Sequence, residues 1–288
     1  MVTLPHVAPE DDSSAAGIHR HAHLIECRLV VYHAAAASEE IVCDVLSEGV
    51  FRGSAQRFED HISALMVPIE SARFDMGTDQ ADVRHFCGES PHHTCKLSAF
   101  QMMRVQVTAE LFSRIDPVQR KPPRPDREKP AVNVTWAQAA LFALWMGCRL
   151  PTEAEWEYSC GAGAPAQWCC ETERQLRSYA WYSFNARDRM QIVATREPNA
   201  LQLFDMHGNA WEWCQDDYDQ YFYHRAPQVD PVQLADAGWA AGAGEKVVRG
   251  GSMNALPEMC RSRYRFHEAA GFWAGDLGFR LARDMNLG

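Results

Sequence analysis

The part of the chain from Ala180 onward is rich in Trp, Gly and Asn and shows no long helical period. Three of its tryptophans, Trp181, Trp211 and Trp213, stand among polar residues. Large rings in this context hold irregular loops in place, because they bury apolar area while the indole N–H finds an acceptor. The pattern therefore predicts an α+β domain with short strands, long ordered loops and these three rings in its core.

Two segments in the first half are predicted to be helices. In "TWAQAALFALWMG", Thr135 stands directly before an apolar run and is predicted to cap its N-terminus. In "PTEAEWEY", Glu155 follows Thr152 at the three-residue spacing of a capping box. Two main helices are therefore expected before the loop-rich part of the chain.

Composition excludes several classes of protein. The 288 residues carry a formal net charge of −10, which argues against a nucleic-acid partner because phosphate contacts need clustered Lys and Arg. No apolar run approaches the roughly 18 residues that span a bilayer, and the first residues lack the basic start and apolar core of a signal peptide. The ten cysteines include no C-x2-C pair, so no zinc or redox motif is indicated. We expect a cytoplasmic protein without membrane insertion.

Several segments resemble, in this order, the formylglycine-generating enzyme (sulfatase-modifying factor) family. They are "FDMGTD", "PHHTCKLSAFQMMRVQVT", "PAVNVTWAQAALFALWMGCRLPTEAEWEY", "AWYSFNARD", "EPNALQLFDMHGNAWEWCQDDYD", "VVRGGS", "CRSRYRF" and "DLGFRLAR". The resemblance implies a C-type-lectin-like fold with small antiparallel sheets, two main helices and long ordered loops, in a domain of residues 64–288. Residues 1–63 lie outside it and are expected to form a partly disordered extension for docking or oligomerisation.

The resemblance also implies where catalysis would take place. Family members that oxidise a sulfatase cysteine use two thiolates, three and eight residues after the Ser of an R/K-G-G-S motif, and two soft thiolates suit Cu(I). Here Ser252 is that serine and Cys260 stands eight residues after it, but Ala255 occupies the other position. Because Ala255 offers no ligand, copper is not expected. Ser252 and Cys260 are candidate catalytic residues only under the alternative of a copper-dependent formylglycine-generating oxidase acting on a sulfatase-type protein.

Cys260 also has a structural interpretation. Non-catalytic relatives carry a similar C-R-S-x-Y-R segment, often with a W-E-W-C segment like the one that ends at Cys214. The resemblance therefore favours framework roles for Cys260, Arg263, Tyr264 and Arg265, and it leaves open that Cys214 and Cys260 are neighbours in the core.

Some of these relatives are variable proteins of diversity-generating retroelements, which keep this scaffold and rewrite the positions between its motifs. On this interpretation the chain is a non-catalytic ligand-binding protein with a C-terminal surface that a retroelement diversifies, and its partner is a protein or another macromolecule. The predicted ligand-binding residues are Met253, Asn254, Ala255, Leu256, Met259, Phe266, His267, Glu268, Phe272 and Trp273.

The segment from Asp205 to Glu212 is a candidate calcium loop. It has a carboxylate at each end, and a hard cation such as Ca2+ takes six to eight oxygens, often from carboxylates together with backbone carbonyls of a tight loop. Active family members bind calcium at the matching loop. The resemblance implies the side chains of Asp205 and Glu212 and the carbonyls of Gly208 and Ala210 as ligands. The alternative, in which both acids simply accept backbone N–H bonds, stays open.

Overall fold

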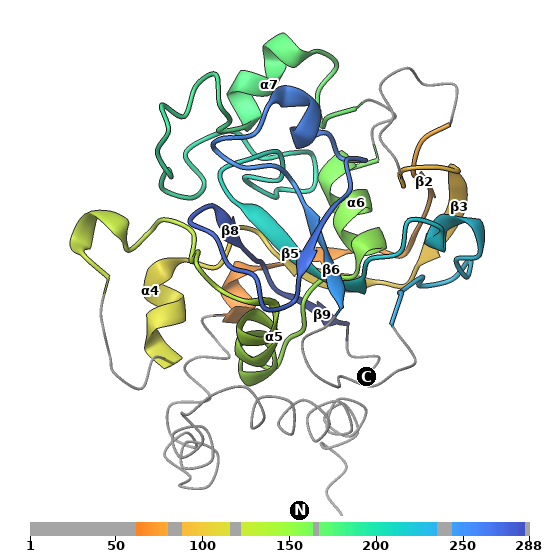
Figure 1. Cartoon of the computed structure of the whole chain (residues 1–288), viewed down its shortest axis with the longest axis horizontal. Helices are drawn as coiled ribbons and strands as arrows, with labels where there is room; N and C mark the ends of the chain where they lie inside the picture. The colour runs from red at the N-terminus through yellow and green to blue at the C-terminus, as the bar shows by residue number, and fades with distance from the viewer. Residues whose placement is uncertain (1–61, 80–87, 116–121, 164–166, 235–243, 286–288) are drawn as a thin grey trace, which may run out of the picture.

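This computed structural model of the chain describes residues 62–79, 88–115, 122–163, 167–234 and 244–285. The predicted extension of residues 1–63 lies outside the described residues except for its last two positions. The described segments combine short strands and helices with long loops (Figure 1), as the α+β prediction requires.

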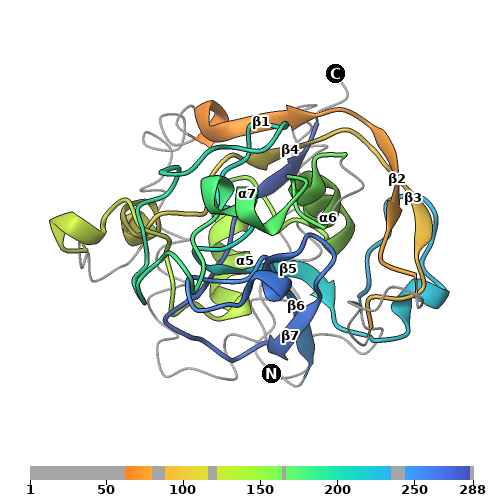
Figure 2. The same cartoon turned by 90° about the horizontal axis from the view of Figure 1, so that it is seen from above.

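Three small sheets make up the frame of the described part (Figures 1 and 2). In one of them β4 lies between β1 and β9, and in another β2 pairs with β3. The largest has the order β7-β6-β5-β8 and is antiparallel except for the short pairing of β5 with β8. The prediction of small antiparallel sheets is confirmed, with one parallel contact added. The strands are β1 (Met66–Ile69), β2 (Ala72–Met76), β3 (His93–Leu97), β4 (Phe100–Met103), β5 (Trp211–Asp217), β6 (Glu245–Arg249), β7 (Phe266–Ala269), β8 (Leu277–Gly278) and β9 (Ala282–Asp284).

Both predicted helices form, and both contact β5. Thr135 caps the first and Thr152 the second, each as half of a complete capping box, with Glu155 as the partner of Thr152. No helix in the described part of the chain combines the length and apolarity needed to cross a bilayer. The helices are α4 (Ala109–Phe112), α5 (Trp136–Trp145), α6 (Glu153–Gly161) and α7 (Glu173–Tyr179), with 3-10 turns η1 (Ser113–Ile115), η2 (Arg124–Asp126), η3 (Phe222–His224) and η4 (Pro257–Cys260).

Four arginines from the C-terminal motifs are buried, and each reaches a buried carboxylate. An unpaired charge at this depth would be very costly, so these pairs are needed once the arginines are buried. The partners lie 68 to 172 positions apart in the chain, so motifs that look separate in the sequence meet in one interior. The pairs are Arg249 with Glu157, Arg261 with Glu89 at 2.8 Å, Arg265 with Glu153 at 2.6 Å and Arg280 with Glu212 at 2.6 Å.

The three predicted core tryptophans differ in burial. Trp213 is fully buried, and its indole N–H donates to a backbone carbonyl at 2.9 Å. Trp181 and Trp211 are only partly buried. Trp211 still packs against two of the hydrophobic clusters, whereas Trp181 belongs to none of them, so the prediction of a core position is wrong for Trp181. The ring of Trp211 lies near those of Tyr264 and Phe266, at centroid distances of 6.0 and 5.4 Å, and therefore borders the surface formed by the C-terminal segment.

Candidate functional site

The loop after β6 depends on glycine at a close approach. Gly251 has a φ of 75°, and a Cβ there would stand 2.6 Å from the Sγ of Cys260. Only glycine combines this left-handed backbone with the space that remains. The loop therefore lies directly against Cys260, which belongs to the turn η4.

Ser252 holds this loop to the segment before β8. Its side chain is buried, and its hydroxyl donates to Oδ2 of Asp276 at 2.7 Å while it accepts from the N–H of Asn254 at 3.2 Å. Both interactions fix the backbone of the loop. In this arrangement the Ser252 hydroxyl acts as a structural link.

Cys260 has the surroundings of a structural thiol. It is fully buried in a hydrophobic cluster with Trp168, Tyr182 and Ala255. Burial, and to a lesser degree the negative charge of Glu258, raises the pKa of the Cys260 thiol well above its ordinary value. Since the thiolate is the nucleophile and the metal ligand, this thiol is protonated and unreactive at neutral pH.

Cys214 and Cys260 are both free thiols that belong to different hydrophobic clusters. Cys214 packs in the cluster that contains Trp156 and Val247. The two thiols are therefore not paired with each other, and each packs in its own cluster. Cys214 lies in β5 and Cys260 in η4.

His207 is a structural residue that the sequence did not single out. It is buried, its Nδ1 lies 2.8 Å from the carbonyl oxygen of Cys260, and its Nε2 accepts from the N–H of Cys169 at 3.0 Å. A carbonyl only accepts, so Nδ1 carries the proton and the ring is neutral. Burial accordingly lowers the pKa of His207 to about 4. No local sequence pattern marks this residue, because its partners come from distant loops.

Three of the four predicted calcium ligands converge on one side-chain amide. Glu212 accepts from Arg280, from Nε at 2.6 Å and from Nη2 at 2.7 Å. The Nε2 of Gln106 lies 3.3 Å from the carbonyl of Gly208, 2.7 Å from that of Ala210 and 3.0 Å from Oε1 of Glu212. An amide nitrogen thus stands where these oxygens meet.

Asp205, the fourth predicted ligand, is also buried. Its Oδ2 accepts from the N–H of Ala194 at 2.8 Å, whereas its Oδ1 has no hydrogen-bond partner, and burial raises the pKa of Asp205 to about 6. Among the described residues, no group of three or more His, Cys, Asp or Glu side chains is placed to hold a metal ion. In this geometry the four residues do not fit a calcium ion, and calcium binding stays a prediction from the resemblance.

The ten predicted ligand-binding residues are not equally available to a ligand. Ala255 is 4% exposed and its carbonyl accepts from the N–H of Ser183, so its methyl group lies beneath the surface and its assignment as a contact is corrected. The exposed members are Asn254, Leu256, Phe272 and Trp273, and the partly exposed members are Met253, Met259, Phe266, His267 and Glu268.

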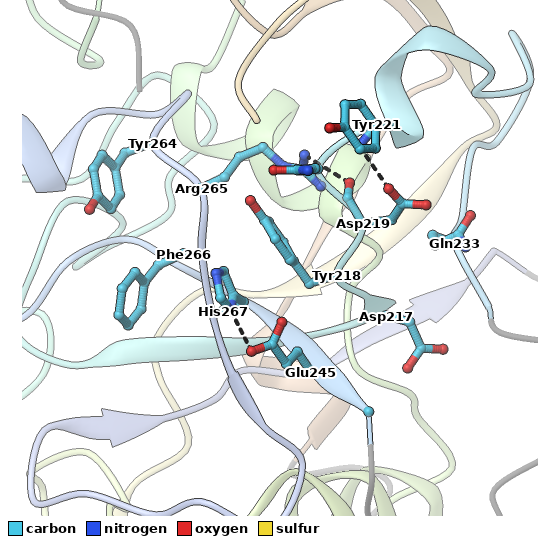
Figure 3. A pocket seen from close by; sticks show the side chains of 12 residues that line it. Asp217, Tyr218, Asp219, Tyr221, Gln233, Glu245, Tyr264, Arg265, Phe266 and His267 are labelled. Atoms are coloured by element: carbon cyan, nitrogen blue, oxygen red, sulfur yellow. Dashed lines mark hydrogen bonds and ion pairs between the residues drawn. The ribbon is translucent and has the colours of Figure 1, made fainter. Parts of the chain in front are cut away.

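A depression of about 760 Å³ opens beside β7 (Figure 3). It lies between the end of β5 with the residues after it (217–221), the start of β6, and residues 264–267. It includes Phe266 and His267 of the predicted face, but neither Ser252 nor Cys260 lines it. The sequence reasoning missed Tyr218, Tyr221 and Glu245, although the run of acids and tyrosines in "QDDYDQY" was a usable signal.

Nearly parallel rings run from this depression toward Trp211. Tyr218 stacks on His267 with ring centroids 4.0 Å apart and planes at 20°. His267 is followed by Phe266 at 5.8 Å and 29°, and Phe266 by Trp211 at 5.4 Å and 30°. This aromatic row joins the depression to the predicted binding face.

The sequence model of the family described as "Sulfatase-modifying factor enzyme 1-like domain" matches residues 53–285. The chain belongs to this family. The match includes the whole described part of the chain, and the predicted family is thereby confirmed.

Two curated relatives have different descriptions. The serine/threonine-protein kinase pkn1 of Chlamydia pneumoniae is 35% identical over 158 residues, which are 54% of this chain and 24% of the kinase. The formylglycine-generating enzyme of Streptomyces coelicolor is 34% identical over 175 residues, which are 55% of this chain and 54% of the enzyme. The chain thus spans about a quarter of the first relative and about half of the second.

Solved structures show the fold. Treponema denticola variable protein 1 superposes with a TM-score of 0.61 at 24% identity, covering 76% of this chain and 95% of that one. PvdO from Pseudomonas aeruginosa superposes with a TM-score of 0.67 at 24% identity, covering 76% and 94%. The predicted C-type-lectin-like fold of the formylglycine-generating enzyme family is confirmed.

Proposed function

We propose that the chain is a non-catalytic ligand-binding protein that presents its C-terminal surface to a protein or another macromolecule. The state of Cys260 is the observation that carries this proposal. An oxidase of the kind that the resemblance implies needs two thiolates for Cu(I). Here one position holds a buried thiol with a raised pKa, and the other holds the buried methyl group of Ala255.

The exposed side chains of the C-terminal segment support a binding role. Trp273 is 61% exposed, Leu256 48% and Phe272 41%. Trp in particular is enriched among the few residues that carry most of the energy of protein interfaces. They stand on loops attached to a rigid frame: the N–H of Met253, for instance, donates to the carbonyl of Asn209 at 2.9 Å.

The contrast between the buried motif residues, which form the frame, and the exposed residues between the motifs, which form the face, supports the idea of retroelement diversification. The motif residues Arg249, Cys260 and Arg280 are fully buried, whereas the intervening Asn254 and Trp273 are exposed. Exposed substitutions usually change stability by about 0.5 kcal/mol or less, so such a scaffold tolerates rewriting of its face. Sequencing the coding 3′ end in many isolates tests this point. Variation between isolates that is confined to the exposed positions supports diversification. If the residues at these positions are the same in all isolates, the idea is overturned.

The described cysteines all carry free thiols. Reducing compartments keep thiols in this state, which supports the proposed cytoplasmic location. Localisation of a tagged full-length chain by cell fractionation tests it, with recovery in a secreted or periplasmic fraction as the contrary result.

An oxidation assay separates the two functions. The purified chain is incubated with Cu(I), oxygen, a thiol reductant that supplies the two further electrons needed to reduce O2 to water, and a sulfatase-type peptide that contains the target cysteine, and formylglycine is measured by mass spectrometry. We expect no product from the wild type and none from Cys260→Ser. The Streptomyces coelicolor enzyme serves as the positive control. Turnover by the wild type that Cys260→Ser abolishes would establish the oxidase and overturn the binding proposal.

A further inference from the structure

Building on the proposed function, we infer that the depression beside β7 binds a cationic side chain, arginine or lysine, of a protein ligand. Three carboxylates and one guanidinium line it, which gives it an excess of negative charge. These residues are Asp217, Asp219, Glu245 and Arg265. The inference depends on which of these charges are already paired.

The guanidinium has its donors engaged elsewhere. Arg265 donates to Glu153 from Nε at 2.6 Å and from Nη2 at 2.7 Å. Its Nη1 lies 2.6 Å from the carbonyl of Gly88 and 3.4 Å from that of Asp219. A bound anion would have to break these buried contacts, which is costly because Glu153 would lose its partner. The depression therefore does not favour an anion.

Glu245 is the carboxylate best placed for a ligand. Asp217 lies 2.6 Å from Nζ of Lys246, and Asp219 pairs with Arg225. The side chain of Glu245 is 56% exposed, and its contact within the depression is with Nδ1 of His267 at 3.2 Å. In Figure 3 its carboxylate lies beside the rings of His267 and Tyr218. A cation placed there gains a charged acceptor, and of these contacts only that between Glu245 and His267 would have to change.

Aromatic rings complete the recognition of an organic cation. The stacked rings of Tyr218 and His267 form a wall next to Glu245, and Tyr221, which is 62% exposed, stands toward the opposite end in Figure 3. Rings attract a guanidinium or ammonium group through their faces, and the aliphatic stem of Arg or Lys packs on apolar surface. The Tyr218 ring already has the Arg265 guanidinium carbon 5.1 Å from its centroid and stacks on His267, so the exposed ring of Tyr221 is the one left for the cation of a ligand.

The dimensions of the site favour a protein over a small amine. A volume of about 760 Å³ lies in the range of pockets that enclose a whole drug-sized ligand, and exceeds what one small cation fills. β7 lies at the edge of its sheet in the described strand order, so an extended chain has access along it. The ligand we infer is an extended segment with one cationic side chain in the depression.

Binding of three capped probes tests the inference. N-acetyl-arginine methylamide carries the guanidinium, N-acetyl-citrulline methylamide is its neutral isostere, and N-acetyl-Gly-Arg-Gly-amide adds backbone. Amide chemical shifts of the full chain are followed by NMR during titration. We expect the arginine probe to bind with a Kd on the order of 1 mM. We also expect the citrulline probe to bind at least about fivefold more weakly. Added salt should lower the affinity for the arginine probe, because salt screens the attraction between exposed charges.

Glu245→Gln provides the decisive variant, because its side chain is exposed and the change preserves its size. It should lower the affinity for the arginine probe about fivefold or more. Glu258 is an exposed acid outside the depression, so Glu258→Gln should leave this affinity unchanged. Tighter binding of the Gly-Arg-Gly probe than of the single residue identifies a protein ligand, and equal binding identifies a small cation instead.

Equal affinities for the arginine and citrulline probes, or an unchanged affinity in Glu245→Gln, would overturn the cation site and leave the non-catalytic function standing. Turnover in the oxidation assay would overturn that function without affecting the titration. The two failures are therefore distinguishable.

Discussion

Arg280 holds Glu212 by two parallel contacts, Nε to Oε2 at 2.6 Å and Nη2 to Oε1 at 2.7 Å. Bidentate pairs of this kind are the strongest hydrogen-bonded ion pairs in proteins. Both side chains are fully buried. Arginine thus neutralises the carboxylate that the resemblance implies as a calcium ligand.

We therefore expect chelation to leave thermal stability unchanged. A ligand that binds only the native state raises the melting temperature by mass action, so removal of a bound calcium ion would lower it. Melting temperatures measured in excess EDTA and in millimolar Ca2+ should agree. A lower value in EDTA would mean that an ion displaces the Gln106 amide from these oxygens.

Gly251→Ala should destabilise the fold. The new Cβ would meet the Sγ of Cys260 at 2.6 Å, and φ is 75°, so steric overlap adds to backbone strain. We expect a loss of about 2–4 kcal/mol in the free energy of unfolding, measured by urea denaturation. Gly271→Ala is the matched control, because a Cβ there meets no atom within 4 Å. Equal losses in the two variants would contradict the packing described for this loop.

Trp213→Ala and Trp273→Ala should have opposite consequences. Trp213 is fully buried, and its truncation should cost about 3–5 kcal/mol of stability. Trp273 is 61% exposed, and its truncation should cost about 0.5 kcal/mol or less while reducing ligand affinity by on the order of 2 kcal/mol. Urea denaturation measures the first quantity and titration with the native ligand the second. If Trp273→Ala unfolds the protein, the division into frame and face is wrong.

Asp216 should make stability fall as the pH rises from about 4 to about 7. Burial, followed by the charge of Glu153, raises the pKa of Asp216 from its ordinary value of 3.8 to about 7. Between these values the native state binds more protons than the unfolded state, so deprotonation favours unfolding. The stability of the wild type relative to Asp216→Asn should fall by up to about 4 kcal/mol over this range. Urea denaturation of both proteins at pH 5, 6 and 7 measures this difference. If the free energies of unfolding of the wild type and Asp216→Asn change with pH in parallel, the pKa of Asp216 is not raised.

Cys260 should resist alkylation in the native protein. Its thiol is fully buried and burial raises its pKa, so both access and thiolate content are low. Iodoacetamide at pH 8, followed by peptide mapping, should modify Cys260 only after unfolding in urea. Rapid modification of the native protein would show that this thiol is reactive and would reopen the oxidase interpretation.

The sequence was informative where local chemistry determines structure. Thr135 and Thr152 mark helix starts because their hydroxyls accept hydrogen bonds from N–H groups a few residues away. Tyr264 and Arg265 were predicted as framework by resemblance, and their burial agrees with that role, whereas Arg263 is only partly buried. These features depend on short stretches of chain, so they can be read without a structure.

Other features depend on contacts that no local pattern encodes. Trp211 and Trp213 stand in the same W-E-W motif and share a face of β5, because residues two apart in a strand point the same way. Only Trp213 is fully buried, since Trp211 is the first residue of the strand and Trp213 lies within its buried stretch. The Gln106 amide among the expected calcium ligands comes from a segment 102 to 106 positions away. Depressions such as the one beside β7 likewise arise from several distant segments, so only the complete fold reveals them.

The buried arginine pairs also determine how the protein is made. Arg261 and Glu89 are separated by 172 residues, and Arg280 and Glu212 by 68. Folds dominated by such distant contacts form slowly, because long loops must close before the contacts stabilise them. During synthesis the carboxylates at positions 89 and 212 leave the ribosome well before their partners. The buried pairs of Arg261 and Arg280 can therefore both form only after translation has passed residue 280.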